Sequence, residues 1–119
     1  MNTIPLQNGN LFPPIQSNPA EESFLDLLRG KDFRIERIVS RGHRSPENFW
    51  YDQPWHEWVV VLKGAARLAV EGREQPVLLS EGDYCLLPAH VRHRVEWTAE
   101  DRETVWLAVH YTADGEEPL

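Results

Sequence analysis

The chain has 119 residues, the length of a single domain, because domains commonly run to about 100–200 residues. Hydrophobic residues make up 41% and charged residues 26%, an ordinary balance for a globular chain, and five tryptophans are too many for an unfolded coil. The formal net charge of −7 argues against nucleic acid as a partner, because contact with phosphate backbones needs clustered Lys and Arg.

The first 31 residues are predicted to form an N-terminal arm and one short helix. Three prolines interrupt residues 1–18, so the arm is expected either to pack against the sheet edge of a neighbouring subunit or to fray. Asn18 followed by Pro19 is typical of a helix start, and Gly30 is a natural helix end. A helix of about three turns is therefore predicted between them.

From residue 32 to residue 112 the pattern changes to short β-type runs that end at Gly, Pro or Asp turns. Runs spaced about every 8–12 residues are typical of an all-β sandwich or barrel, so this region is predicted to be a barrel of two packed antiparallel sheets. Residues 113–119 are expected to form a loose tail. The predicted runs are residues 33–39, 59–62, 65–70, 77–79, 84–87, 91–98 and 104–111.

Two stretches stand out by their spacing. In the first, Glu57 is followed after six residues by Gly64. In the second, Gly82 is followed after five residues by Pro88, and His93 comes five positions later. These stretches resemble the two signature motifs of the cupin superfamily, in the version found in small single-domain members.

The resemblance covers about residues 33–112 and implies a cupin-like double-stranded β-helix, a jelly-roll barrel, assembled as a homodimer. In cupins the motif histidines and glutamate converge inside the barrel on a divalent metal. Of these, Glu57 and His93 are present here, whereas Tyr51 and Gln53 stand in the places of the first-motif histidines. The resemblance therefore implies that Gln53, Glu57 and His93 could hold Fe, Mn, Ni or Zn, although two strong ligands are few for zinc.

Strand periodicity predicts a pocket around these residues. Residues 51, 53 and 57 share one parity, as do residues 93, 95 and 97, so each set can point into the barrel. For Glu57 the alternative is a salt bridge at the barrel mouth, and for His93 it is a hydrogen-bonded core histidine. A surface position for His43 and core packing for Trp106 and His110 also remain open. The predicted ligand-pocket residues are His43, Tyr51, Gln53, Trp97, Trp106 and His110.

Two functions follow from this interpretation. In the first, the barrel binds a small organic ligand in its interior, with or without a divalent metal. In the second, it is a metal-dependent cupin enzyme of the oxygenase or isomerase type, with Glu57 and His93 as catalytic residues. The fold alone does not choose between them, because one fold hosts many chemistries. No leader-type segment and no apolar run of about 18 residues is present, so a cytoplasmic protein without membrane contact is expected.

Overall fold

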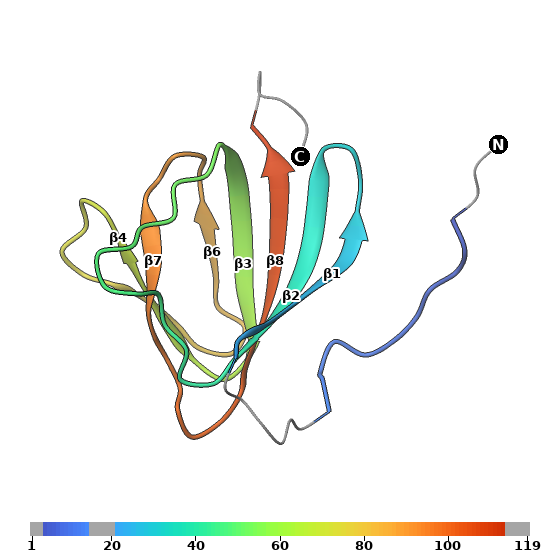
Figure 1. Ribbon diagram of the computed structural model, residues 1–119, viewed down its shortest axis with the longest axis horizontal. Coiled ribbons are helices and arrows are strands. Elements are labelled where there is room, and N and C mark those ends of the chain that lie inside the picture. The colour runs from blue at the N-terminus through green and yellow to red at the C-terminus, as the bar shows by residue number, and fades with distance from the viewer. Residues whose placement is uncertain (1–3, 15–20, 114–119) are drawn as a thin grey trace.

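The computed structural model describes residues 4–14 and 21–113, and within them the chain forms strands and no helix (Figure 1). The prediction of an all-β fold is confirmed. The alternation of apolar and polar residues has the period of two that suits a pleated sheet. The strands are β1 (Ser23–Arg29), β2 (Phe33–Ser40), β3 (Trp55–Lys63), β4 (Ala66–Val70), β5 (Val77–Leu79), β6 (Tyr84–Leu87), β7 (His93–Thr98) and β8 (Thr104–Thr112).

The strands make two antiparallel sheets with a hydrophobic core between them (Figure 1). The larger sheet has the order β1-β2-β8-β3-β6, and the smaller has the order β5-β4-β7. Both sheets contribute to the core, since Val61 on β3 and Trp106 on β8 pack in one cluster with Leu68 on β4. The inward faces of the two sheets therefore enclose the barrel interior, as a jelly roll requires.

The predicted helix is wrong for the residues that the structure describes. Residues 23–29 form β1, which pairs antiparallel with β2, and the predicted helix start at residues 18 and 19 lies outside the described residues. Gly30 does not end a helix; its N–H donates to the carbonyl of Phe33 at 2.9 Å and begins the hairpin turn between β1 and β2. Pairing with the exposed edge of β2 supplies backbone hydrogen bonds that outweigh the weak local helix signals.

The N-terminal arm is seen as residues 4–14, which extend away from the barrel (Figure 1). The predicted tail falls almost entirely on residues 114–119, which lie outside the described residues. Among residues 4–14 and 21–113 there is no helix that could cross a lipid bilayer.

Candidate functional site

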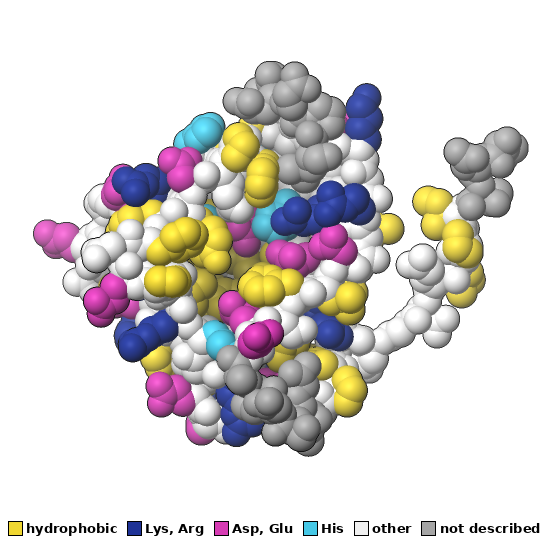
Figure 2. All heavy atoms as spheres, viewed as in Figure 1, with side chains coloured by type: hydrophobic (Ala, Val, Ile, Leu, Met, Phe, Trp, Pro, Cys, Tyr) yellow, Lys and Arg dark blue, Asp and Glu magenta, His cyan; other side chains and the backbone are white. Residues whose placement is uncertain are grey.

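A cavity of about 230 Å³ lies between the two sheets. Figure 2 shows it as a hollow near the middle of one face, where hydrophobic, acidic and histidine side chains gather. The floor follows a cross-strand row of the larger sheet, in which Arg34, His110, Glu57 and Leu87 are successive partners on β2, β8, β3 and β6. Directly opposed residues share one face of an antiparallel sheet, so this row brings distant parts of the chain together.

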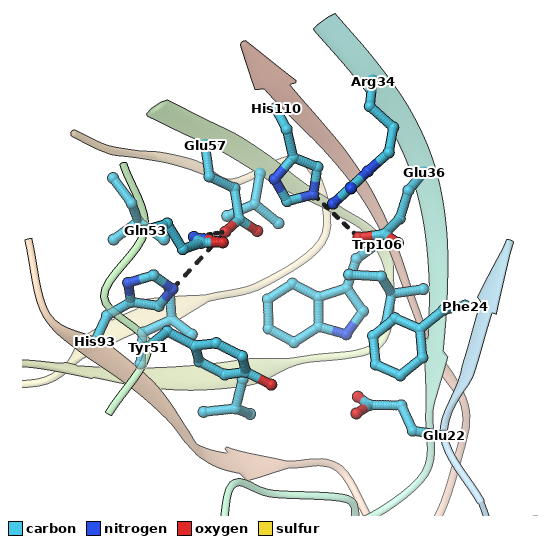
Figure 3. Close-up of a pocket in the computed structure, with 15 residues that line it drawn as sticks. Glu22, Phe24, Arg34, Glu36, Tyr51, Gln53, Glu57, His93, Trp106 and His110 are labelled. Atoms are coloured by element: carbon cyan, nitrogen blue, oxygen red, sulfur yellow. Dashed lines mark hydrogen bonds and ion pairs between the residues drawn. The ribbon is translucent and has the colours of Figure 1, made fainter. Parts of the chain in front are cut away.

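Glu57 and His93 face each other across the cavity from opposite sheets (Figure 3). Glu57 Oε1 lies 3.8 Å from His93 Nε2, which is too long for a hydrogen bond, and accepts one from Gln53 Nε2 at 2.9 Å. The His93 Nδ1 lies 3.2 Å from the Val91 carbonyl, which can only accept, so Nδ1 carries the proton. In a neutral imidazole this leaves the Nε2 lone pair pointing toward Glu57.

Burial raises the pKa of Glu57, and the negative charge of Glu36 raises it further, while positive charge on His110 or His93 would act in the opposite direction. The carboxyl is taken out of water into the barrel, where its charged form loses solvation. A protonated Glu57 also removes the repulsion between its oxygen and the His93 lone pair. The raised pKa therefore favours a proton on the Glu57 carboxyl beside the cavity.

This pKa direction predicts how stability depends on pH. Because the folded state binds the Glu57 proton more tightly than the unfolded state, stability is lost as the pH rises from the unfolded value through the folded pKa. Glu57→Gln should remove this loss, keep the oxygen that accepts from Gln53, and raise the free energy of unfolding above that pKa by about 1 kcal/mol. Urea unfolding of both proteins across pH 4–9 measures the difference.

The matched control is the exposed Glu47, whose replacement by Gln should leave the pH profile of stability unchanged. Parallel profiles for wild type and Glu57→Gln would contradict the assignment of a buried proton to Glu57.

Tyr51 closes one side of the cavity next to His93. Its ring stacks on the imidazole with centroids 5.4 Å apart and planes at 22°, and the two backbones form an isolated bridge. Burial raises the pKa of Tyr51, and so do the charges of Glu22, Glu57 and Glu36. The side chain therefore remains a phenol that can donate a hydrogen bond into the cavity.

His110 forms a second buried pair with a carboxylate on the other side of the cavity (Figure 3). The Trp55 indole N–H can only donate, and it donates to His110 Nδ1 at 3.0 Å. The proton of the neutral ring therefore sits on Nε2, which donates to Glu36 Oε1 at 3.0 Å. Both ring nitrogens are thus engaged, and Glu36 keeps its other oxygen for the cavity.

The structure brings six of the predicted site residues together and leaves two outside. Tyr51, Gln53, Glu57, His93, Trp106 and His110 all line the cavity. His43 lies in the loop before the first motif, where its Nδ1 accepts from the Arg41 N–H at 2.9 Å and its carbonyl accepts from the Thr98 hydroxyl at 2.7 Å. His43 itself does not line the cavity, although Tyr51 and Gln53, later in the same connection between β2 and β3, do.

Trp97 lies on the opposite face of β7 from His93, although equal parity predicts the same face. In the pairing with β4, Val95 opposes Leu68 and Trp97 opposes Arg67, so Glu96 is an extra residue at a β-bulge. The bulge shifts the alternation by one, and Trp97 points away from the cavity. There the Arg67 guanidinium lies 5.7 Å from the centre of its indole ring, in cation–π contact.

Sequence reasoning missed the polar residues of the first two strands. Arg34 and Glu36 share the inward face of β2 with Ile38. The period of the strand could have grouped them, but three of the four residues in the alternate set are apolar, so that set would be taken for the inward one. The alternate set is Phe33, Ile35, Arg37 and Val39. The two lining residues next to or on β1 fell in the predicted helix. The missed residues with polar or aromatic side chains are Glu22, Phe24, Arg34 and Glu36.

The residues present do not fit a tightly held resident metal. Glu57 and His93 Nε2 are the two strong donors at the implied position, and Gln53 adds only a neutral oxygen. His110 is not available, because both of its ring nitrogens are already hydrogen-bonded. Within the described part of the chain, no group of three or more His, Cys, Asp and Glu is arranged to hold an ion. Zinc in proteins takes three or four strong ligands.

Comparisons with known proteins agree with this architecture. Curated relatives include the 3-hydroxyanthranilate 3,4-dioxygenases of Burkholderia lata and Paraburkholderia phytofirmans, each 38% identical over 69 residues. That match covers 56% of this chain but only 38% of each dioxygenase. A solved structure, proposed to be a mannose-6-phosphate isomerase from Ralstonia eutropha JMP134, is 47% identical, with a TM-score of 0.86 over 90% of this chain and 99% of the other.

A cupin superfamily protein from Desulfitobacterium hafniense DCB-2 is 15% identical, with a TM-score of 0.68 over 83% of this chain and 84% of the other, and shares the fold. The family model of the cupin domain matches residues 38–110, which span both motifs and most of the strands described above. The chain belongs to the cupin family.

Proposed function

We propose that the cavity binds a small organic molecule built on one six-membered ring that carries hydroxyl groups. The observation that carries this proposal is a partly open cavity lined by three carboxyl groups, of Glu22 just before β1, Glu36 on β2 and Glu57 on β3, and by aromatic rings beside them. Its volume of about 230 Å³ is below the roughly 300–1,000 Å³ of pockets for drug-sized ligands, so a single ring with its substituents is the appropriate size.

The carboxyl groups set the polarity of the ligand. Each of the three carboxyl groups accepts one hydrogen bond from a neighbouring side chain: Glu22 from the Ser40 hydroxyl, Glu36 from His110 and Glu57 from Gln53. Each therefore keeps at least one oxygen lone pair for a ligand in the cavity. A carboxyl oxygen with a free lone pair accepts a hydrogen bond whether or not the group carries a proton, and a buried acceptor gains from a donor. Hydroxyl or amino substituents on the ring would supply those donors.

The ring itself would lie among aromatic side chains. In Figure 3, Trp106 lies between His93 on one side of the cavity and Glu36 on the other, with Tyr51 and Phe24 beside it. The Trp106 indole N–H already donates to the Ser40 hydroxyl at 3.2 Å, which holds its ring in place. Flat apolar faces beside a few fixed polar groups are the usual means of orienting a small ligand.

Arg34 supports an acidic substituent on the same ligand. Among the described lining residues it is the one arginine, held 6.0 Å from the centre of the Trp55 ring. Its buried Nε has no hydrogen-bond partner in the described structure and lies 3.8 Å from Asp26 Oδ1, in an ion pair without a hydrogen bond. A guanidinium binds phosphate and carboxylate through two parallel hydrogen bonds. Mannose 6-phosphate and 3-hydroxyanthranilate, named for two of the similar proteins, both join a hydroxylated six-membered ring to an acidic group.

Titration calorimetry and tryptophan fluorescence with mannose, mannose 6-phosphate and 3-hydroxyanthranilate test the proposal. We expect saturable binding of at least one of the two acidic compounds, weakened about tenfold or more in Arg34→Ala because a charge-assisted contact is lost. Arg44→Ala, which removes an exposed arginine outside the cavity, should bind like wild type. No saturable binding of any of the three at millimolar concentration would overturn the proposal.

The second candidate is a metal-dependent cupin enzyme of the oxygenase or isomerase type, with Glu57 and His93 as its catalytic residues and Gln53 beside them. The observation that favours it is the His93 lone pair aimed at Glu57. Metal analysis of protein grown with added Fe, Mn, Ni and Zn separates the two candidates. We expect less than stoichiometric metal; a full equivalent that is lost in His93→Ala would establish the metal-dependent alternative instead.

A further inference from the structure

Glu22 is an acidic residue of the cavity wall with which no Lys or Arg pairs. It lies immediately before β1 and lines the cavity together with Phe24, Tyr51 and Trp106. All 12 Lys and Arg residues of the chain lie within residues 21–113, and no ion pair of the described structure includes Glu22. A positively charged group on a ligand would therefore meet an unpaired carboxylate.

A buried chain of hydrogen bonds fixes the direction of the Glu22 carboxyl. The Trp106 indole N–H donates to the Ser40 hydroxyl at 3.2 Å, and Ser40 donates its own proton to Glu22 Oε2. Ser40 is 1% exposed and Trp106 is 3% exposed, so little water competes for these contacts. The other oxygen, Oε1, makes no hydrogen bond to the described residues. One oxygen is thus anchored, and the other is available to a ligand.

Three aromatic side chains accompany this carboxyl. Figure 3 draws the Glu22 carboxyl turned toward the cavity, below the Phe24 ring, with the Tyr51 hydroxyl on the same side of the Trp106 indole. The face of an aromatic ring attracts a cation, and groups of such rings bind organic ammonium ions in proteins. A carboxylate beside the rings adds a charge-assisted hydrogen bond. The combination suits an ammonium group.

The charges that act on Tyr51 agree with this geometry. Burial raises the pKa of Tyr51 most, and Glu22 comes first among the three carboxylates that raise it further, before Glu57 and Glu36. A negative potential at the phenol oxygen disfavours its ionised form, and the same potential attracts a cation. The wall beside Glu22 and Tyr51 is therefore negative, although Arg34 lines the same cavity.

We propose that Glu22 and the aromatic rings beside it bind an ammonium group of the ligand, which makes Glu22 the residue that selects an amine over the corresponding alcohol. The remainder of that ligand, a ring with an acidic group near Arg34, rests on the proposed function. Glu22 is better suited than Glu36, because Glu36 shares the inward face of β2 with the Arg34 cation two residues away and accepts from His110.

An amine and an alcohol differ at this position in charge more than in size. Both can donate a hydrogen bond to Glu22 Oε1, but a hydrogen bond between two ions is about twice as strong as one between neutral groups. At pH 7 an alkylammonium keeps its proton, as the side chain of lysine does. Only the amine also gains from the aromatic faces. A preference of about tenfold or more is therefore expected.

Titration calorimetry of the full chain at pH 7 with two matched pairs of compounds tests the proposal. Mannosamine 6-phosphate and mannose 6-phosphate differ in one amino or hydroxyl group on the ring. Benzylamine and benzyl alcohol differ by the same exchange on a ring without an acidic group. We expect wild type to bind the amine of a pair about tenfold or more tightly than the alcohol. Glu22→Gln keeps the oxygen that accepts from Ser40 but loses the charge, so it should bind both members of a pair within about twofold.

The matched control is Glu21→Gln, which makes the same charge change at the exposed neighbouring residue outside the cavity lining and should keep the preference. Circular dichroism checks that each variant is folded. If Glu22→Gln is not, Phe24→Leu replaces it, and loss of the flat ring should reduce the preference about threefold.

The two pairs separate this proposal from the proposed function. A preference for benzylamine without binding of either sugar phosphate would support the ammonium site and count against the ring with an acidic group. Binding of mannose 6-phosphate with no preference for the amine in either pair would overturn the ammonium site alone. A preference that persists in folded Glu22→Gln, or that Glu21→Gln loses equally, would also overturn it.

Discussion

Gly64→Ala is expected to destabilise the fold by about 4 kcal/mol, a large part of the stability of a domain of this size. Gly64 lies in the turn from β3 to β4 at a φ of 91°, where side chains other than hydrogen are strained. An added Cβ would also come within 2.6 Å of the Thr104 Cα and 2.7 Å of the Glu103 carbonyl oxygen. Backbone atoms cannot move aside cheaply, so the turn would have to open. Urea unfolding measures the loss.

Gly72→Ala is the matched control for this substitution. Gly72 has nearly the same φ, 89°, but nothing lies within 4 Å of the position that its Cβ would take. The backbone strain alone should cost about 1 kcal/mol. The difference between the two variants therefore isolates the contact with the strand that begins at Thr104, and equal losses would show that the close approach does not matter.

His110→Asn is expected to cost about 3 kcal/mol and to weaken ligand binding, because it removes the partner of two buried groups. The His110–Glu36 pair is 3.0 Å long and its side chains are 4% and 13% exposed. Without the imidazole, the Glu36 carboxyl and the Trp55 N–H lose their hydrogen bonds inside the barrel. Chemical unfolding measures the first effect, and titration with the proposed ligands measures the second.

The chain contains its own control for burial. His90 and Asp52 form a pair of the same length, 3.0 Å, but with side chains 63% and 48% exposed. His90→Asn should change stability by less than about 0.5 kcal/mol, because exposed ion pairs contribute little and asparagine tolerates the positive φ of 66° found there. A loss as large as that of His110→Asn would mean that burial is not the cause.

The sequence was sufficient for the class of fold and for the two motifs. The β-type runs from residue 33 onward correspond to strands, and the prediction of a small cupin barrel is confirmed by the family match and the solved structures. These features are local, because a strand is recognised by its period of two and a turn by its Gly or Pro. The shared parity of Tyr51, Gln53 and Glu57 is local as well, and the structure places all three in the cavity lining.

Other parts of the site depend on pairings that no local pattern contains. Glu36 and His110 are 74 residues apart and meet because β2 and β8 are neighbours in the sheet. Trp97 turned away from the cavity because of one extra residue in β7, which is visible only in its pairing with β4.

By itself the sequence determined a small acidic chain of short strands with cupin motif spacing, because composition, turn residues and strand period act over a few positions. Tertiary structure alone decided that residues 23–29 join the sheet as a strand, and which face of β2 looks inward. Both outcomes follow from long-range pairing, since backbone hydrogen bonds to a neighbouring strand outweigh weak helix signals. A strand that is mostly apolar on its outer face and mostly polar toward the cavity can be oriented only by what packs on each side of it.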